Sequence, residues 1–255
     1  FRMLYSSLCK YICSYPASLL NCMDLNEQEK DYITKLIKNY ESGGDFKITV
    51  EKVGQQGGKS DVNLLVTFSY QNEEKKSTVG ISAKFYSDLT SLNLGRKVAT
   101  NFVDDCNIHD PEGNFDIDAF LDNPQGKAED FKDSIRTNAE NILRHFLQGD
   151  AENPASNPAH LLLIGHNKVV AHGDPKFYVA NNNALLDTIF RNAKVTVKTN
   201  WKDGKPGSFK ILVNGEQVAT LSYKEGTFSM ETRAAFEDTI KLHAVPRSVD
   251  FSKIG

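Results

Sequence analysis

The sequence predicts a mixed α/β (α+β) fold, with helices flanking a central mixed β-sheet and a C-terminal part rich in strands. Apolar residues recur at helical spacing over 25–41 and again over 128–149. Strand patterns, in which apolar and polar residues alternate, occupy three early segments: 46–53, 60–70 and 77–86. Further strand patterns fill the chain after residue 194. Strands in both halves, separated by helices, favour a mixed sheet.

The chain begins with an expected helix over 25–41, which Gly43 or Gly44 ends, followed by the three early strands. A short loop and a helix are then expected over 88–103, before an acidic stretch over 104–133. The later expected elements are helices over 118–124 and 128–149, a strand pair over 159–167 and 168–173, a helix over 182–192, and strands over 194–200, 208–215, 216–226 and 227–236, with a hairpin turn at 213–216.

Residues 23–255 are expected to form a single domain, with its core over about 25–190 and its strand-rich part over about 191–240. Residues 1–22 are interpreted as a disordered or non-native extension, because "MDLNEQEK" from Met23 resembles an ordinary protein start. The extension is too short and too interrupted by polar residues to span a membrane. We therefore expect no membrane association.

Composition limits the classes of function. The chain has 255 residues and a net charge of −3, so a site for nucleic acid must come from a local basic patch. Its four cysteines form no CxxC pair and match no zinc-site spacing. They are also too sparse for a disulfide scaffold, which predicts a reducing, cytoplasmic location.

Asp61, Ser82 and Lys84 are the candidate catalytic residues. Side chains alternate along a strand, so Ser82 and Lys84 share one face of the strand over 77–86. If this strand pairs with the one over 60–70, Asp61 emerges on the same side. Two interpretations follow: an exposed Asp–Lys ion pair without function, or the reactive end of an enzyme.

Glu51 is the candidate second carboxylate. Pairing of the first two strands places it roughly opposite Asp61, and directly opposed residues lie ~5 Å apart. Two like charges there need a cation between them. Carboxylate oxygens suit Mg²⁺, which polarises a phosphodiester and lowers the pKa of a water. Lys84 can stabilise charge on the phosphate, so this pattern indicates hydrolysis of phosphodiesters.

The motif "SD" followed after 20 residues by "SAK" resembles that of the PD-(D/E)xK nucleases. The segments "KSDVNLLV" and "GISAKFYSDLTSLNLGRKVATNFV" are similar to type II restriction endonucleases, over about residues 25–105. The resemblance implies a restriction-endonuclease-like core with Asp61 as the acid and Lys84 as the lysine. It also implies Mg²⁺ as cofactor and double-stranded DNA as substrate.

Two positions depart from the family pattern. Ser60 stands in place of the proline, and Ser82 stands in place of the second acid. Glu51 is the first substitute for that acid. The other candidates are Glu41, Asp88 and Asp104. If no carboxylate reaches the site, the protein is a catalytically inactive relative.

A basic segment over 191–224 is the candidate DNA-contacting region, because it carries seven Lys/Arg against two acids. Lysines that neutralise phosphates give salt-dependent DNA affinity. The candidate contacts are Lys198, Lys202, Lys205 and Lys210. An ordinary lysine-decorated strand surface is the alternative interpretation.

These observations together predict a Mg²⁺-dependent, site-specific endonuclease of the type II restriction kind, which cuts double-stranded DNA. Asp61 and Glu51 are the expected metal ligands, and Ser82 lines the site. The resemblance further implies a homodimer, because two-fold protein symmetry matches palindromic DNA. The rival prediction is a non-catalytic DNA- or protein-binding module on the same scaffold.

Overall fold

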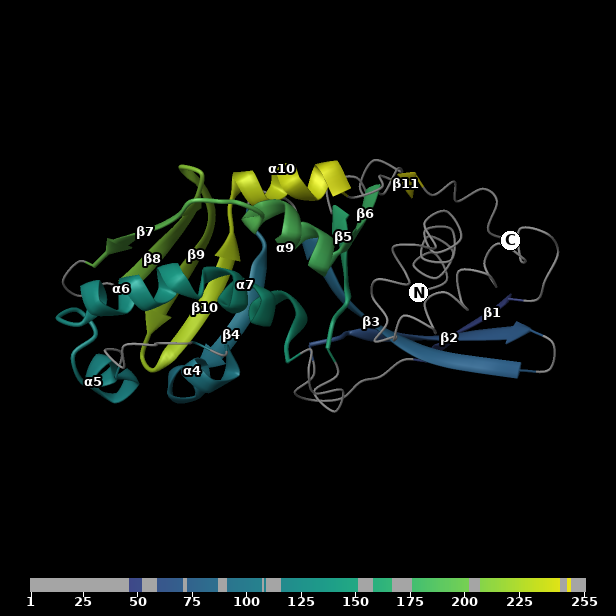
Figure 1. Ribbon diagram of the computed structural model, residues 1–255, viewed down its shortest axis with the longest axis horizontal. Helices are drawn as coiled ribbons and strands as arrows, with labels where there is room; N and C mark the ends of the chain where they lie inside the picture. The colour runs from purple at the N-terminus through teal and green to yellow at the C-terminus, as the bar shows by residue number, and fades with distance from the viewer. Residues whose placement is uncertain are drawn as a thin grey trace. The chain divides into compact units, whose positions relative to one another are not determined.

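The structure is a computed structural model in which residues 46–51, 59–70, 73–86, 91–106, 108, 116–150, 158–166, 176–201, 207–243 and 247–248 are described. Within them the chain forms a mixed α/β fold with two β-sheets and six α-helices (Figure 1). This confirms the predicted fold class at that level. The expected helix over 25–41 lies outside the described residues.

The described chain divides into two compact units. The first contains residues up to Ser87, Ala151–Asn183 and the residues from Ala244 onward. The second contains Asp88–Asp150 and Ala184–His243. Each unit contains residues from both sides of position 190, and the single domain predicted over 23–255 stays a prediction.

The first unit is built on a mixed sheet with strand order β1-β2-β3-β5-β6-β11. Its strands are β1 (Phe46–Glu51), β2 (Val62–Tyr70), β3 (Glu73–Tyr86), β5 (Leu161–His166), β6 (Lys176–Asn181) and β11 (Arg247–Ser248). β3 and β5 run parallel, and the other neighbours are antiparallel. All four residues of 161–164 are buried, as expected for a strand covered on both faces.

The partner of β5 begins later than predicted. The expected strand over 168–173 lies outside the described residues, and β6 at 176–181 is the strand that pairs antiparallel with β5. Helix α9 (Asn182–Phe190) follows β6 directly and confirms the helix predicted over 182–192.

The second unit contains an antiparallel five-stranded sheet with order β4-β10-β9-β8-β7. Its strands are β4 (Asn93–Val98), β7 (Val195–Asn200), β8 (Gly207–Val213), β9 (Glu216–Lys224) and β10 (Thr227–Thr232). The predicted hairpin turn after β8 is confirmed. Asn214 and Gly215 there have φ of 51° and 89°, as a tight two-residue hairpin turn requires.

Four helices pack with this sheet, together with the short helices that follow β4. They are α5 (Ile117–Asp122), α6 (Ala128–Thr137), α7 (Ala139–Gln148) and α10 (Ala234–His243). The Asp116 carboxylate begins α5 by accepting from the amides of Asp118 and Ala119 at 2.9 and 3.1 Å. Gly149 ends α7 with a φ of 79°.

An aromatic core joins these helices to the sheet. Phe131 of α6 contacts Phe209 of β8, with ring centroids 5.3 Å apart. Phe120 of α5 and Phe228 of β10 complete the cluster with centroids 5.9 Å apart. All four rings are fully buried. The sheet face that carries Phe209 and Phe228 is therefore the inner face, covered by α5 and α6.

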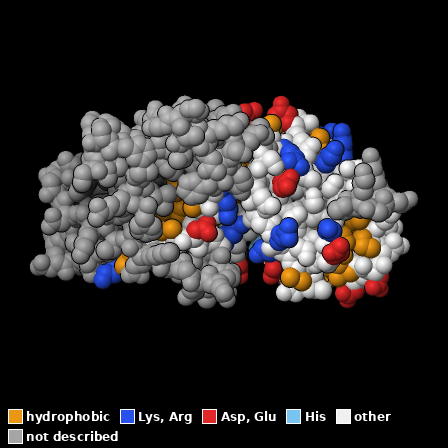
Figure 2. Space-filling model, turned by 180° about the vertical axis from the view of Figure 1, so that it is seen from behind, with side chains coloured by type: hydrophobic (Ala, Val, Ile, Leu, Met, Phe, Trp, Pro, Cys, Tyr) orange, Lys and Arg blue, Asp and Glu red, His pale blue; other side chains and the backbone are white. Residues whose placement is uncertain are grey.

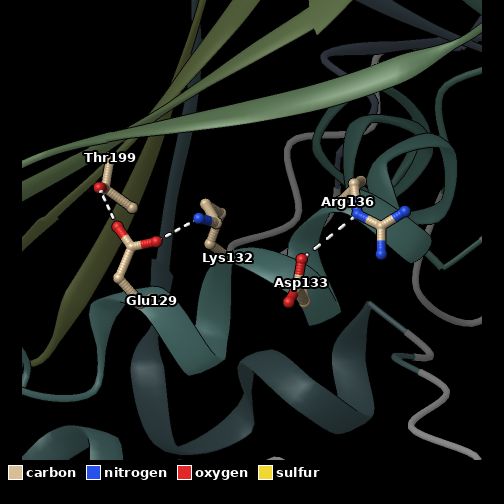
Figure 3. A network of polar contacts seen from close by, with 5 residues as sticks. All are labelled: Glu129, Lys132, Asp133, Arg136 and Thr199. Atoms are coloured by element: carbon tan, nitrogen blue, oxygen red, sulfur yellow. Dashed lines mark hydrogen bonds and ion pairs between the residues drawn. The ribbon is translucent and has the colours of Figure 1, made fainter.

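A polar network fastens α6 to the edge strand β7 (Figure 3). Thr199 of β7 donates a hydrogen bond to Glu129 at 2.6 Å, and Lys132 of the same helix also binds Glu129. These hydrogen bonds, from Lys132 first and then Thr199, lower the pKa of the Glu129 carboxyl. The Thr199 contact also shows that alternate residues of β7 point away from α6.

Two element predictions are wrong. The segment over 88–103 was expected as a loop and a helix, but 93–98 forms β4, which pairs with β10. Helical residues follow only in the 3-10 turn Ala99–Asn101 and in α4 (Phe102–Asp105). The strand expected over 227–236 ends at Thr232, and α10 begins two residues later with Phe236 and Ile240 buried.

Within the described residues, no helix is both long and apolar enough to cross a membrane.

Candidate active site

The candidate site lies where β2 begins beside the middle of β3. Val62 pairs with Ile81, and the Asp61 amide donates to the Ile81 carbonyl at 2.8 Å. The antiparallel ladder therefore extends one residue beyond β2. Asp61 consequently lies opposite Ser82, on the sheet side that also carries Lys84.

The carboxylate of Asp61 is held in a defined position. Its Oδ2 accepts a hydrogen bond from the Ala83 amide at 2.7 Å and another from the Ser82 hydroxyl at 3.2 Å. The side chain is otherwise exposed. A fixed carboxylate that is open to solvent is the kind of oxygen ligand that Mg²⁺ binds.

Ser82 is almost fully buried, with 1% of its surface exposed. Its hydroxyl donates to Asp61, so its position suits an orienting role toward the carboxylate. The structure brings Asp61 and Ser82 together as the strand parity predicted.

Lys84 is half-buried and lies two residues beyond Ser82 on β3. No ion pair joins it to Asp61 in the described part of the chain, where every recorded pair lies elsewhere. The interpretation as a simple Asp–Lys surface pair therefore lacks its central contact. The lysine is placed on the same sheet side as Asp61 without being neutralised by it.

Glu51 pairs with Asn63, two residues along β2 from Asp61. The sequence predicts Glu51 roughly opposite Asp61, so the observed register of β1 against β2 differs from the predicted one by two residues. Diagonal neighbours of this kind lie about 7–8 Å apart, which long side chains can still span. The Glu51 side chain itself lies outside the described part of the structure.

The metal prediction therefore rests on Asp61 and on carboxylates that the structure does not describe. Among the described residues, no group of three or more His, Cys, Asp or Glu side chains can hold a metal ion. Of the other candidate acids, Glu41 and Asp88 lie outside the described residues, and Asp104 belongs to α4 in the second unit. The Asp61 carboxylate fits a metal as one oxygen ligand.

Ser60 fixes the start of β2 beside the site. It is buried, and its hydroxyl accepts from the Ile81 amide at 2.9 Å and lies 2.8 Å from the Val62 carbonyl, to which it can donate. These bonds connect β2 to β3 directly next to Asp61. Sequence reasoning treated Ser60 only as a replacement for proline and missed this role.

Gly80 and His160 anchor the other edge of β3. The Gly80 amide donates to His160 Nδ1 at 3.0 Å, and the His160 amide donates to the Gly80 carbonyl at 2.8 Å. A Cβ at position 80 would lie 1.9 Å from the Pro158 carbonyl oxygen, so only glycine fits. Sequence reasoning assigned no role to His160, although its place directly before an apolar central strand was a usable signal.

The candidate DNA-contacting lysines lie in the second unit. Lys198 of β7 and Lys210 of β8 are directly opposed across the two strands, and Lys198 is exposed while Lys210 is half-buried. Lys202 and Lys205 lie outside the described residues.

A scan against protein-family models and a search of curated protein sequences both find no match for this chain.

Proposed function

We propose that the protein is a Mg²⁺-dependent endonuclease that hydrolyses phosphodiester bonds of double-stranded DNA at a short specific sequence. One observation carries the proposal. The Asp61 carboxylate is held by the Ala83 amide and the Ser82 hydroxyl, and Lys84 lies on the same sheet side with no recorded ion pair to any described residue. A fixed acid and a lysine on the same side of adjacent strands is the arrangement that the resemblance to type II restriction endonucleases implies.

In this proposal Asp61 and Glu51 would hold Mg²⁺, which supplies Lewis-acid polarisation of the scissile phosphate when it is bound. Lys84 binds a phosphate oxygen and stabilises the negative charge that develops on it. Ser82 keeps one Asp61 oxygen turned toward β3, which leaves the other oxygen for a ligand. The substrate is aligned by phosphate contacts in the basic region, which includes Lys198 and Lys210.

The function is tested by incubating purified protein with plasmid and phage DNA, in Mg²⁺ and in EDTA. Discrete fragments that form only with Mg²⁺ support site-specific cleavage. Lys84→Ala and Asp61→Asn should each abolish cleavage while thermal stability stays near wild type. Lys76→Ala is the matched control, because Lys76 is exposed on the same strand β3 and should be dispensable.

A non-catalytic DNA- or protein-binding module is the second candidate. Its support is the buried hydroxyl of Ser82 in the position of the second acid, which leaves the described site one carboxylate short. This candidate predicts DNA binding that needs no divalent metal and survives Lys84→Ala. Binding without cleavage on any DNA would favour it.

Two further parts of the proposal concern assembly and location. The resemblance alone implies a homodimer, which would present two sites with the two-fold symmetry of a palindrome. Sedimentation of the protein with and without a DNA duplex tests this. The cytoplasm is the proposed location, because the four cysteines are too sparse for a disulfide scaffold.

A further inference from the structure

The five-stranded sheet of the second unit has one covered face and one polar face. Phe209 and Phe228 belong to the inner face under α5 and α6. Because side chains alternate along each strand, Ser208, Lys210 and Ser229 point to the opposite side. We call this opposite side the outer face.

A row of polar residues crosses all five strands of the outer face. The strand registers align Arg96 of β4 with Ser229, Ser229 with Ser222, Ser222 with Ser208, and Ser208 with Asn200 of β7. Adjacent strands lie about 4.8 Å apart, so the row spans about 19 Å. The serines are half-buried and the two end residues are exposed. In the described part of the chain, their side chains make no recorded hydrogen bond.

Positive charge surrounds this row. Lys198 and Lys210 are opposed in the neighbouring row, two residues along their strands from Asn200 and Ser208. Within the described residues neither lysine takes part in a recorded ion pair, and neither does Arg96. Figure 2 shows Lys and Arg side chains spread over the second unit, with some Asp and Glu side chains and a hydrophobic patch among them.

The one acid of these rows is neutralised from within the fold. Glu231 of β10 pairs with Arg233 at 3.1 Å. Arg233 also donates to the Thr220 hydroxyl at 3.0 Å, which fixes it in place. Arg96, Lys198 and Lys210 are therefore the charges of these two rows that have no recorded ion pair among the described residues, although the whole chain carries a net charge of −3.

We infer that the outer face docks the phosphate backbone of a DNA duplex. Serine, asparagine, lysine and arginine side chains are the groups that position proteins on phosphates. A second copy of this chain does not fit, because a two-fold contact brings the same basic surface of each copy together. The inference rests on the proposed function for its ligand, and it adds Arg96 and the serine row to the predicted lysines.

The test compares two triple variants with the same loss of charge. Arg96→Ala/Lys198→Ala/Lys210→Ala removes three basic side chains from the outer face. Lys127→Ala/Lys132→Ala/Arg136→Ala removes two lysines and one arginine from α6 and its N-cap residue, on the side of the inner face. Binding of a labelled 20-base-pair duplex is measured in EDTA over a series of salt concentrations, and circular dichroism checks that each variant is folded.

Each phosphate contact contributes about 0.9 to the slope of log affinity against log salt. The outer-face variant should therefore lose about 2–3 from the slope and bind at least 10-fold more weakly, while the α6 variant keeps the wild-type slope. Equal slopes for the two variants would overturn the inference, as would tighter binding to an RNA duplex of equal length. Ser222→Glu, a single change at the centre of the row, should weaken binding in the same direction and serves if the triple variant does not fold.

Cleavage separates this inference from the proposed function. If the wild-type protein cuts DNA but the two variants have equal slopes, the outer-face inference is wrong and the nuclease proposal is supported. If the wild-type protein never cuts DNA but only the outer-face variant has a reduced slope, the outer-face inference is supported and the nuclease proposal is wrong. A wild-type protein that binds no duplex overturns the docking surface.

Discussion

Gly80→Ala is expected to destabilise the candidate site through a backbone collision. The added Cβ would lie 1.9 Å from the Pro158 carbonyl oxygen and 3.0 Å from Ser60 Oγ. The first distance is about 1 Å shorter than real Cβ contacts allow, and the colliding atom is backbone, so no side-chain rotation relieves it. Overpacking of this kind costs about 1–3 kcal/mol. The backbone movement that relieves this collision would also disturb the His160 hydrogen bonds that anchor β3 beside Ser82.

Thermal unfolding followed by circular dichroism measures this effect. A loss of about 1–3 kcal/mol lowers Tm by about 2–12 °C in a chain of this size. Gly126→Ala is the matched control. The three atoms nearest to its Cβ would all belong to the exposed Asn123 side chain, which can rotate away with the loss of one exposed hydrogen bond from the Gly126 amide. The steric reasoning is refuted if the Tm values of Gly80→Ala and Gly126→Ala differ by less than about 1 °C, which is below the smallest expected effect.

Three other predictions concern single side chains. Ser60→Ala removes the acceptor of the buried Ile81 amide and should lower the free energy of unfolding by about 1–3 kcal/mol in urea titrations; a change below about 0.5 kcal/mol would contradict this. Burial raises the pKa of the Cys106 thiol, so the thiol stays neutral in the folded chain, whereas the unfolded chain ionises it as the pH rises past about 8.5. Wild-type stability should then fall by up to about 1.4 kcal/mol per pH unit relative to Cys106→Ala, and parallel curves would exclude it. The pKa of Glu129 is lowered, so its stabilising contribution exists above the ordinary Glu range and is lost on acidification. Glu129→Gln should therefore be slightly less stable than wild type at pH 7, and the difference should shrink as the pH falls below the ordinary Glu range; a constant difference would argue against the network with Thr199.

Local strand alternation predicted the central pairing of the site. The parity of 60–70 and 77–86 placed Asp61 and Ser82 together because neighbouring antiparallel strands leave little freedom of register once one face is apolar. The same reasoning left the Glu51 register two residues off, because the length of the intervening turn does not fix how the two strands meet.

Features that depend on distant pairing could not be predicted in this way. β4 was expected as part of a helix because its partner β10 lies more than a hundred residues later, and no local pattern reports that contact. His160 joins β3 only because β3 and β5 are parallel neighbours, separated in the chain by most of the second unit. The outer face likewise emerges only when five strands are aligned. In the sequence alone, its serines look like ordinary solvent-facing strand residues.

The most direct test of the account is cleavage of a diverse DNA substrate by wild-type protein, Lys84→Ala and Lys76→Ala, each with Mg²⁺ and with EDTA. The account predicts discrete fragments from wild type and Lys76→Ala in Mg²⁺ only, and none from Lys84→Ala. It is contradicted if folded wild-type protein leaves every DNA intact in Mg²⁺, or if Lys84→Ala cuts as fast as wild type.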